Sequence, residues 1–220
     1  MPATRAVGTA LLYVAAVKTF AVPLYLYRRQ VDWRTLGAML AGGIPGVLAG
    51  TLLLSGAETR GLSQLVLGVV GVTVAVSASL TLARCFSQAR HAVGRRRLKT
   101  LGVASAAIGL EVGFSSAGAG ALGTVTLFHF TALSAATVVG TDLLFGFVLS
   151  ALGGSFHFAA GTYDAAVTLR LIGGGIAGAL VGAQAACRLP ARALRIGISV
   201  LLVGLGGPLL LRSIGTLWAR

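Results

Sequence analysis

Long apolar stretches separated by short polar breaks dominate the chain. The stretches cover residues 7–27, 35–54, 62–83, 101–132, 138–158, 166–187 and 193–211. Most of them are close to the roughly 20 apolar residues that a helix needs to cross the hydrocarbon core of a bilayer. None shows the polar–apolar alternation over about ten residues that a membrane β-strand requires. The pattern therefore predicts an all-α integral membrane protein with about seven transmembrane helices.

The stretch 101–132 is too long for a single span and is rich in glycine. We interpret it as a hairpin of two helices, broken or partly re-entrant, because non-helical backbone at membrane depth is tolerated where protein or a cavity surrounds it. Within it, GAGALG at 118–123 matches the GxGxxG dinucleotide fingerprint. That fingerprint needs a preceding strand and a soluble βαβ unit. Membrane spans surround this segment instead, so we exclude dinucleotide binding.

Composition agrees with a membrane location. The chain of 220 residues is 56% hydrophobic and only 10% charged, with a mean hydropathy of +0.90. A soluble domain has roughly a quarter of its residues charged, and disorder requires low hydrophobicity.

The first apolar run contains Lys18 and ends at Arg28, so it lacks the cleavage site of a signal peptide and is interpreted as a mature span. The two cysteines form neither a CxxC nor a CxxCH pattern, which leaves no disulfide framework or attached haem.

Charge is lopsided, with 18 Lys and Arg against 5 Asp and Glu, a net charge of +13. Such a balance can indicate nucleic acid, but in a membrane protein it is first a topology signal. If 84–99 is cytoplasmic, alternating crossings place 28–34 and 188–195 on the same side. These segments carry six, three and three cationic residues, whereas four lie outside. We therefore expect a multi-pass protein of the cell membrane with loop 84–99 in the cytoplasm, in contact with lipid headgroups and not with nucleic acid.

The chain also matches itself at an offset of 132 residues, with 12 identities in the 45 positions from 6 to 50. Opposite charge bias at matching loops indicates that the two copies have opposite orientation. Two inverted repeats are the organisation of many secondary transporters, although duplication for stability alone is the alternative. The domains are then 1–83, a first repeat without its opening hairpin, 84–100, a basic loop, and 101–220, the second repeat. Matching residues include Val7-Gly8-Thr9 with Val139-Gly140-Thr141, Asp32 with Asp164, and Gly42, Gly46 and Gly50 with Gly174, Gly178 and Gly182.

The repeated glycines and aspartates have simple structural interpretations. Glycines spaced by four place small residues on one helix face, which allows close helix packing in lipid. Asp32 and Asp164 each stand just before a predicted helix, where a carboxylate can cap free N–H groups. We therefore predict packing for the glycines and capping for the two aspartates.

Three ionisable residues lie at membrane depth: Lys18, Glu111 and Asp142. Each costs about 2.5–3.5 kcal/mol at a helix centre on insertion scales, so each calls for an explanation. Lys18 can pair with an anionic substrate or form a salt bridge with Glu111 or Asp142. The two acids can bind H⁺ or Na⁺ as coupling ions, and Asp142 can alternatively cap its helix.

The Gly-rich segment of the hairpin offers a second kind of site. A broken helix exposes N–H groups, and the positive end of its dipole attracts anions. Ser115, Ser116 and Thr124 add hydroxyl donors, while a tightly packed small-residue hairpin is the alternative. His129 and His157 lack partners at metal-ligand spacing and are interpreted as interfacial or hydrogen-bonded. No nucleophile–base pair is recognisable, so we expect neither an enzyme, nor a metal site, nor a cofactor.

Several motifs together resemble the sulfite exporter TauE/SafE family of membrane transporters. In the second half they are VGFSSAGAGALG (112–123), VVGTDLLFG (138–146) and the HFAAGTYD hairpin that ends at Asp164. In the first half, 6–19, 27–33 and 42–50 are similar to the same family. Two features depart from it: Gly-Thr-Ala at 8–10 stands where the second repeat has Gly-Thr-Asp, and no hairpin precedes Val7. We expect an incomplete gene start or a shortened homologue, and we prefer the first.

The resemblance implies a secondary transporter that moves small anions by alternating access, with sulfite, sulfonates or related organosulfur compounds as substrates. Transport of other small organic acids, or a non-transporting accessory or assembly role, is the alternative. The expected partners are the anion, the bilayer and H⁺ or Na⁺; a homo-oligomer is left open. The predicted coupling residues are Glu111 and Asp142. The predicted substrate-binding residues are Lys18, Thr19, Gly113, Ser115, Ser116, Gly118, Gly120 and Thr141.

Overall fold

The computed structural model describes residues 2–59, 98–116 and 120–188, and these residues form helices and connecting turns without a strand. Four helices are long and apolar enough to cross a membrane: Ala3–Tyr27, Trp33–Gly56, Leu98–Ser115 and Ala136–Ala159. The prediction of an α-helical membrane protein is thereby confirmed. The predicted spans 62–83 and 193–211 lie outside the described residues. The helices are α1 (Ala3–Tyr27), α2 (Trp33–Thr59), α4 (Leu98–Ser115), α5 (Ala121–Phe130), α6 (Ala135–Ala159) and α7 (Ala165–Arg188).

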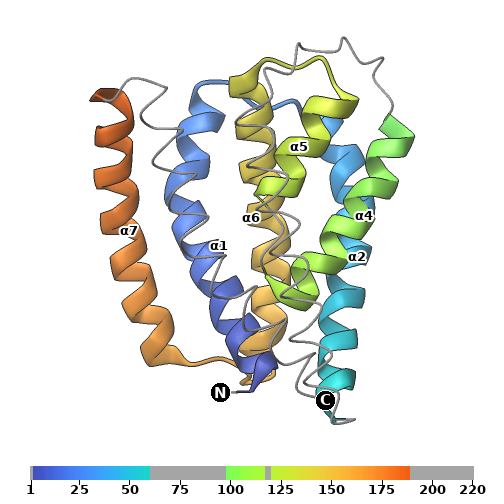
Figure 1. Cartoon of the computed structure of the whole chain (residues 1–220), viewed down its shortest axis with the longest axis vertical. Coiled ribbons are helices and arrows are strands. Elements are labelled where there is room, and N and C mark those ends of the chain that lie inside the picture. Colours follow the sequence, from blue (N-terminus) through green and yellow to red (C-terminus); the bar gives the residue numbers. More distant parts are fainter. Residues whose placement is uncertain (1, 60–97, 117–119, 189–220) are drawn as a thin grey trace, which may run out of the picture.

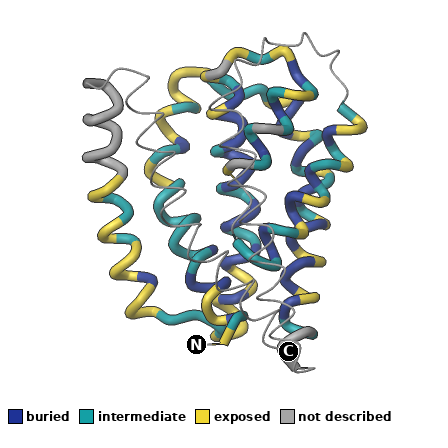
Figure 2. The backbone as a smooth tube through the Cα atoms, in the orientation of Figure 1, coloured by how far each residue is buried: buried dark blue, intermediate teal, exposed yellow. Residues whose placement is uncertain are grey.

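The helices stand side by side, with α6 between α1 and the α2–α4 pair (Figure 1). Helix α5 lies against α4 and α6, and α7 packs on α1 at the edge of the described bundle. Buried positions concentrate on α6 and on the faces of α1 and α2 turned toward it (Figure 2). Large apolar side chains such as Phe20, Leu52 and Val103 instead point away from the described helices. An apolar outer surface of this kind suits contact with lipid.

The stretch 101–132 forms two helices, as predicted, with α4 beginning at Leu98 and α5 ending at Phe130. At 1.5 Å per residue, the 10 residues of α5 extend about 15 Å, half of the hydrocarbon core. Ser116, just after α4, has a φ of 63°, a left-handed conformation that ends the helix. The hairpin is therefore unequal, with a long first helix and a short second one that begins part-way through the bundle and returns to the end where α4 began (Figure 1).

Glycines let α2 and α4 approach each other closely. A Cβ on Gly42, Gly46 or Gly50 would overlap a backbone carbonyl of α4, and these glycines face residues 102, 106 and 110 in turn. The predicted packing role is confirmed for this first stripe. In the second stripe, a Cβ on Gly174 or Gly178 would meet no atom of the described residues. The two stripes therefore have the same spacing but different surroundings in the described part of the chain.

We expect Gly46→Ala to lower the apparent Tm of the purified protein in detergent by roughly 2–12 °C. The added Cβ would lie 2.8 Å from the Leu110 nitrogen and 3.1 Å from the Ala106 carbonyl carbon, which forces the helices apart. Overpacking costs typically about 1–3 kcal/mol, or roughly 2–4 °C per kcal/mol in a chain of this size. Gly37→Ala is the matched control, since its Cβ would meet nothing. Equal shifts for both variants would contradict the packing role.

Residues paired by the 132-residue offset adopt the same local structure. Helices α1 and α6 begin at Ala3 and Ala135 and end at Tyr27 and Ala159, an offset of 132 at both ends. After each helix comes a left-handed residue, Arg29 with φ 53° and then Gly161 with φ 66°. The next residue of each copy, 30 or 162, donates its N–H at 2.9 Å to the carbonyl five positions earlier. The repeated sequence thus encodes a repeated helix–turn unit.

The two predicted aspartate caps are also present. Asp32 Oδ1 accepts the Thr35 N–H at 2.8 Å, and Asp164 Oδ1 accepts the Val167 N–H at 3.0 Å. Both aspartates therefore cap the helix that follows them, α2 in one copy and α7 in the other. The predicted capping role is confirmed.

Candidate functional site

The centre of the site is Asp142, whose side chain is only 5% exposed. Thr124 Oγ1 donates a hydrogen bond of 2.7 Å to Asp142 Oδ2. Oδ1 is buried and accepts no hydrogen bond within the described part of the chain. The backbone of Gly123 lies directly against this oxygen, so a Cβ at position 123 would overlap it. Ser134 caps α6. Helix capping therefore does not explain why a carboxylate stands at position 142.

The carboxylate of Asp142 lies beside the first turn of α5. Both of its described neighbours, Gly123 and Thr124, belong to that turn. The first N–H groups of a helix have no partner within it, and they carry the positive end of its dipole. The dipole of α5 therefore attracts negative charge toward this end of the helix, and the broken-helix anion site stays a prediction.

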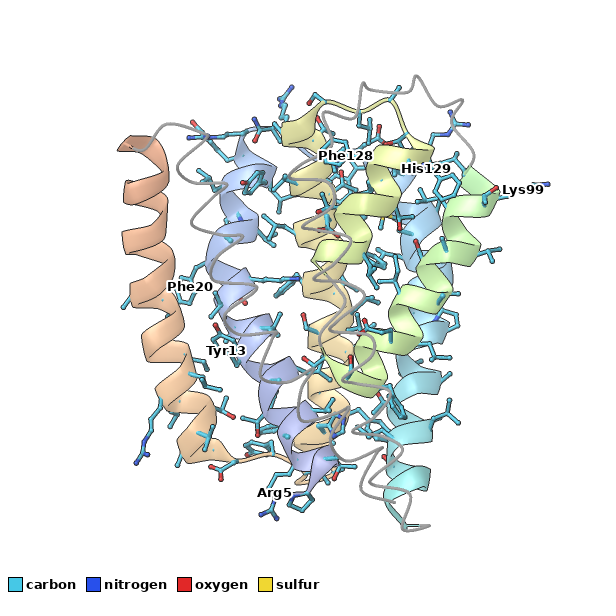
Figure 3. The ribbon with its side chains drawn as sticks, in the orientation of Figure 1. Arg5, Tyr13, Phe20, Lys99, Phe128 and His129 are labelled. Carbon is cyan, nitrogen blue, oxygen red and sulfur yellow. The ribbon has the colours of Figure 1, made fainter. Side chains whose placement is uncertain are left out.

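Lys18, on α1, supplies the opposite charge. Lys18 and Asp142 interact electrostatically across the contact between α1 and α6, at a longer range than a salt bridge. Lys18 stands nine residues before the end of α1 and Asp142 seven residues after the start of α6. At 1.5 Å per residue, both lie roughly 10–14 Å from the same end of the bundle. Phe20, two residues beyond Lys18, lies between the ends marked by Arg5 and Lys99 (Figure 3). The pair is thus well inside the hydrocarbon layer.

The third ionisable residue at membrane depth has a different environment. Glu111, on α4, accepts a 2.6 Å hydrogen bond at Oε1 from the hydroxyl of Ser115, one turn further along the same helix. Of the two acids considered as salt-bridge partners for Lys18, Asp142 is the one that interacts with it electrostatically, and it does so without forming a salt bridge. Two predicted residues, Glu111 and Ser115, therefore form a local pair on α4, separate from the contacts of Asp142.

The other predicted residues of α1 and the hairpin do not gather around Asp142. Thr19 is exposed, and its hydroxyl donates to the Ala15 carbonyl of its own helix. Gly113 packs against the carbonyl of Val47 on α2, a contact that accounts for a glycine at this position. Ser116 and Gly120 stand at the end of α4 and the start of α5, and Gly118 lies outside the described residues.

Thr141, the last predicted residue, is fully buried and connects the two copies. Its hydroxyl oxygen accepts the Asp32 N–H at 3.0 Å. The equivalent bond has the two copies exchanged: Thr9 Oγ1, in the first copy, accepts the N–H of Asp164, in the second copy, at 2.9 Å. Sequence reasoning missed Thr9, although the repeated Gly-Thr pair was the signal that could have found it. The described structure therefore gives both threonines a role in joining α1 to α6.

His157 and His129 have different surroundings. The Nδ1 atom of His157 and the hydroxyl of Thr162 are 2.8 Å apart and share a hydrogen bond. His129 is exposed at the end of α5 (Figure 3). The hydrogen-bonded interpretation is confirmed for His157.

A shallow groove lies where α1 ends and α6 begins, but it holds none of the predicted site residues. We assign the site to the charge pair of Lys18 and Asp142 instead, because a half-buried lysine and a buried aspartate at membrane depth are costly without a function. The groove is lined by Leu24, Tyr25, Arg28, Gln30, Ala136 and Val139.

Apolar helices that cross the membrane several times, with a charge pair between two of them, define a multi-pass α-helical membrane protein. The chain belongs to the sulfite exporter TauE/SafE family, whose family model matches residues 1–209. It is similar to YjnA, a probable membrane transporter protein of Bacillus subtilis strain 168, with 26% identity over 208 residues, covering 90% of this chain and 82% of the relative. No solved structure matches the chain. The family is one of membrane transporters, and the chain is therefore a membrane transporter.

Proposed function

We propose that the protein is a secondary transporter of small anions, with sulfite, sulfonates and related organosulfur compounds as its substrate class. The family description supports the sulfur-bearing substrate. The chemistry of Lys18 supports the anion, because a cationic side chain at membrane depth needs a negative partner.

The observation that carries this proposal is the buried Asp142 carboxylate, which accepts the Thr124 hydroxyl and lies within electrostatic reach of Lys18 where α1 packs on α6. These two helices come from the two copies, so the pair lies at the contact between the halves. Transporters built from inverted repeats bind substrates there, near the middle of the membrane, often beside a discontinuous helix. The short helix α5 supplies such an element, with its first turn at Asp142.

Alternating access between two inverted halves is the proposed mechanism. Helices α1 and α6 are antiparallel, and the start of each is bonded to the loop that follows the other. Such reciprocal bonds support two equivalent halves related by inversion. Rocking of one half against the other would expose the charge pair to each side in turn.

We place the protein in the cell membrane, with the end that carries Lys99 in the cytoplasm. Figure 3 shows Arg5 and Lys99 at opposite ends of the bundle. Arg28, Arg29 and Arg34 stand between α1 and the first turn of α2, at the same end as Lys99. The positive-inside rule assigns this richer end to the cytoplasm.

Reconstituted vesicles test the function. We expect the purified full chain to exchange labelled sulfite and methanesulfonate across the membrane faster than protein-free vesicles, with acetate as the carboxylate comparison. Exchange of an external label for unlabelled internal anion (counterflow) needs no driving force. Counterflow of neither sulfur anion above the protein-free rate would contradict the proposal and favour an accessory role.

A further inference from the structure

We propose that Lys18 and Asp142 exchange partners during transport: a proton neutralises Asp142, and the substrate anion then replaces the carboxylate as the partner of Lys18. This inference rests on the proposed transport function and names its coupling ion. It makes the protein a proton–anion symporter that carries one proton with each monovalent anion.

Charge balance inside the membrane is the first argument. Lys18 and Asp142 place one basic and one acidic group within electrostatic reach of each other, so their charges offset each other when both are ionised. Protonation alone leaves the ammonium uncompensated, and anion binding alone adds an unbalanced negative charge. Either half-loaded state is costly, because a single charge at membrane depth is then left without an opposite charge near it. The site is neutral only when both ligands are bound or both are absent, so their binding must be cooperative.

The carboxylate already occupies the position that an anion would take. It accepts the Thr124 hydroxyl, interacts electrostatically with Lys18 and lies at the first turn of α5. A sulfite or sulfonate oxygen would use the same hydroxyl, the same ammonium and the same helix end. Asp142 therefore acts as a built-in competitor of the substrate, and protonation is the event that removes the competition.

A proton fits the free oxygen of this carboxylate better than a metal cation does. Oδ1 is buried against the backbone of Gly123, which leaves little room on that side for further ligands. Hard cations are bound by several oxygen ligands. The ammonium of Lys18 repels any metal cation, and this repulsion is strong in a medium of low dielectric constant. A proton needs one lone pair and no coordination shell.

Lys18 is the charged group that acts on Asp142 among the described residues. Helices α1, α2, α4 and α5 all pack against α6. Among the side chains that the structure describes on these helices, the remaining ionisable ones belong to other environments: Glu111 is bonded to Ser115, and Lys99, Arg34 and His129 stand at helix ends. Those on α1 are Arg5, Tyr13, Tyr25 and Tyr27. A pH effect on coupling is therefore assigned to the Lys18–Asp142 pair.

The experiment measures methanesulfonate transport in vesicles that contain the full chain. Methanesulfonate remains a monovalent anion at all pH values used. An inward proton gradient of one pH unit should accumulate it about tenfold in wild-type vesicles. A potassium diffusion potential set with valinomycin should change nothing, because the proton and the anion together carry no net charge.

The variant Asp142→Asn separates binding from coupling. Its neutral amide resembles the protonated acid, so methanesulfonate counterflow should persist and lose its pH dependence, while accumulation driven by the proton gradient should disappear. Asp142→Glu should retain accumulation. Asp164→Asn is the matched control, because asparagine also caps helices and Asp164 lies away from the pair; it should couple like the wild type.

The outcomes distinguish the two proposals. Absence of wild-type counterflow with both methanesulfonate and sulfite overturns the transport function itself. Wild-type counterflow without gradient-driven accumulation, or with accumulation that follows the membrane potential, overturns proton coupling alone. Proton coupling is also overturned if folded Asp142→Asn still accumulates the anion or loses counterflow. The two wild-type measurements decide the matter even if that variant does not fold.

Discussion

Replacing Lys18 with alanine is expected to lower the rate of methanesulfonate counterflow by roughly a hundredfold. The substitution removes the positive charge that compensates an anion between α1 and α6. An uncompensated charge at this depth costs about 2.5–3.5 kcal/mol on insertion scales, and each 1.4 kcal/mol corresponds to a factor of about ten. Initial rates in vesicles with equal amounts of reconstituted protein provide the measurement.

Two further substitutions show whether the charge at this position is responsible. Lys18→Arg keeps a cation and should retain much of the rate, although its planar guanidinium differs in shape from an ammonium. Lys99→Ala removes an exposed lysine at the start of α4 and should leave the rate unchanged. If Lys18→Ala exchanges anions as fast as the wild type, the site assignment is wrong and the transport function stands.

The helices could be predicted from the sequence because lipid demands long, continuous apolar segments. The predicted span 138–158 became α6, Ala135–Ala159, and the span 35–54 became α2, Trp33–Thr59. Both helices extend beyond the apolar run, because backbone hydrogen bonding continues into polar residues at the membrane surface. Hydropathy therefore locates the spans better than it locates helix ends, where capping residues such as Ser134 decide the boundary.

The partner of Lys18 could not be predicted in the same way. Glu111 and Asp142 were equal candidates in the sequence, since each is a single acid in an apolar stretch. Only the packing of α1 on α6 selects Asp142, and only the return of α5 brings Thr124 to it. Contacts between helices distant in sequence depend on the three-dimensional arrangement, which periodicity along one chain does not contain.

The joining of the two copies is a related case. The repeat at 132 residues identified Gly-Thr and Asp as matching positions, and their local structures follow the sequence. That the Thr of one copy accepts the amide of the other copy's Asp is a property of the antiparallel arrangement. A sequence repeat indicates equivalent units but leaves open whether their bonds stay within a unit or cross to its partner.

The double variant Thr9→Val/Thr141→Val is expected to unfold at a clearly lower temperature than either single variant. Each valine removes the oxygen that accepts a backbone N–H, of Asp164 in one copy and of Asp32 in the other. Leaving such a donor unsatisfied costs about 1–3 kcal/mol. The two bonds lie at opposite ends of the bundle, so their effects should add. The sum is roughly 2–6 kcal/mol, measured as the loss of apparent Tm in detergent.

Matched variants relate this loss to the hydroxyl groups. Thr9→Ser and Thr141→Ser keep the acceptor and should stay close to the wild-type Tm. Thr19→Val removes a hydroxyl that bonds only its own helix, so it should have little effect. Equal losses for Thr9→Val and Thr141→Val are expected, since the two bonds are equivalent under the repeat. A loss at one position alone would contradict that equivalence, and with it the inverted pair of halves on which alternating access depends.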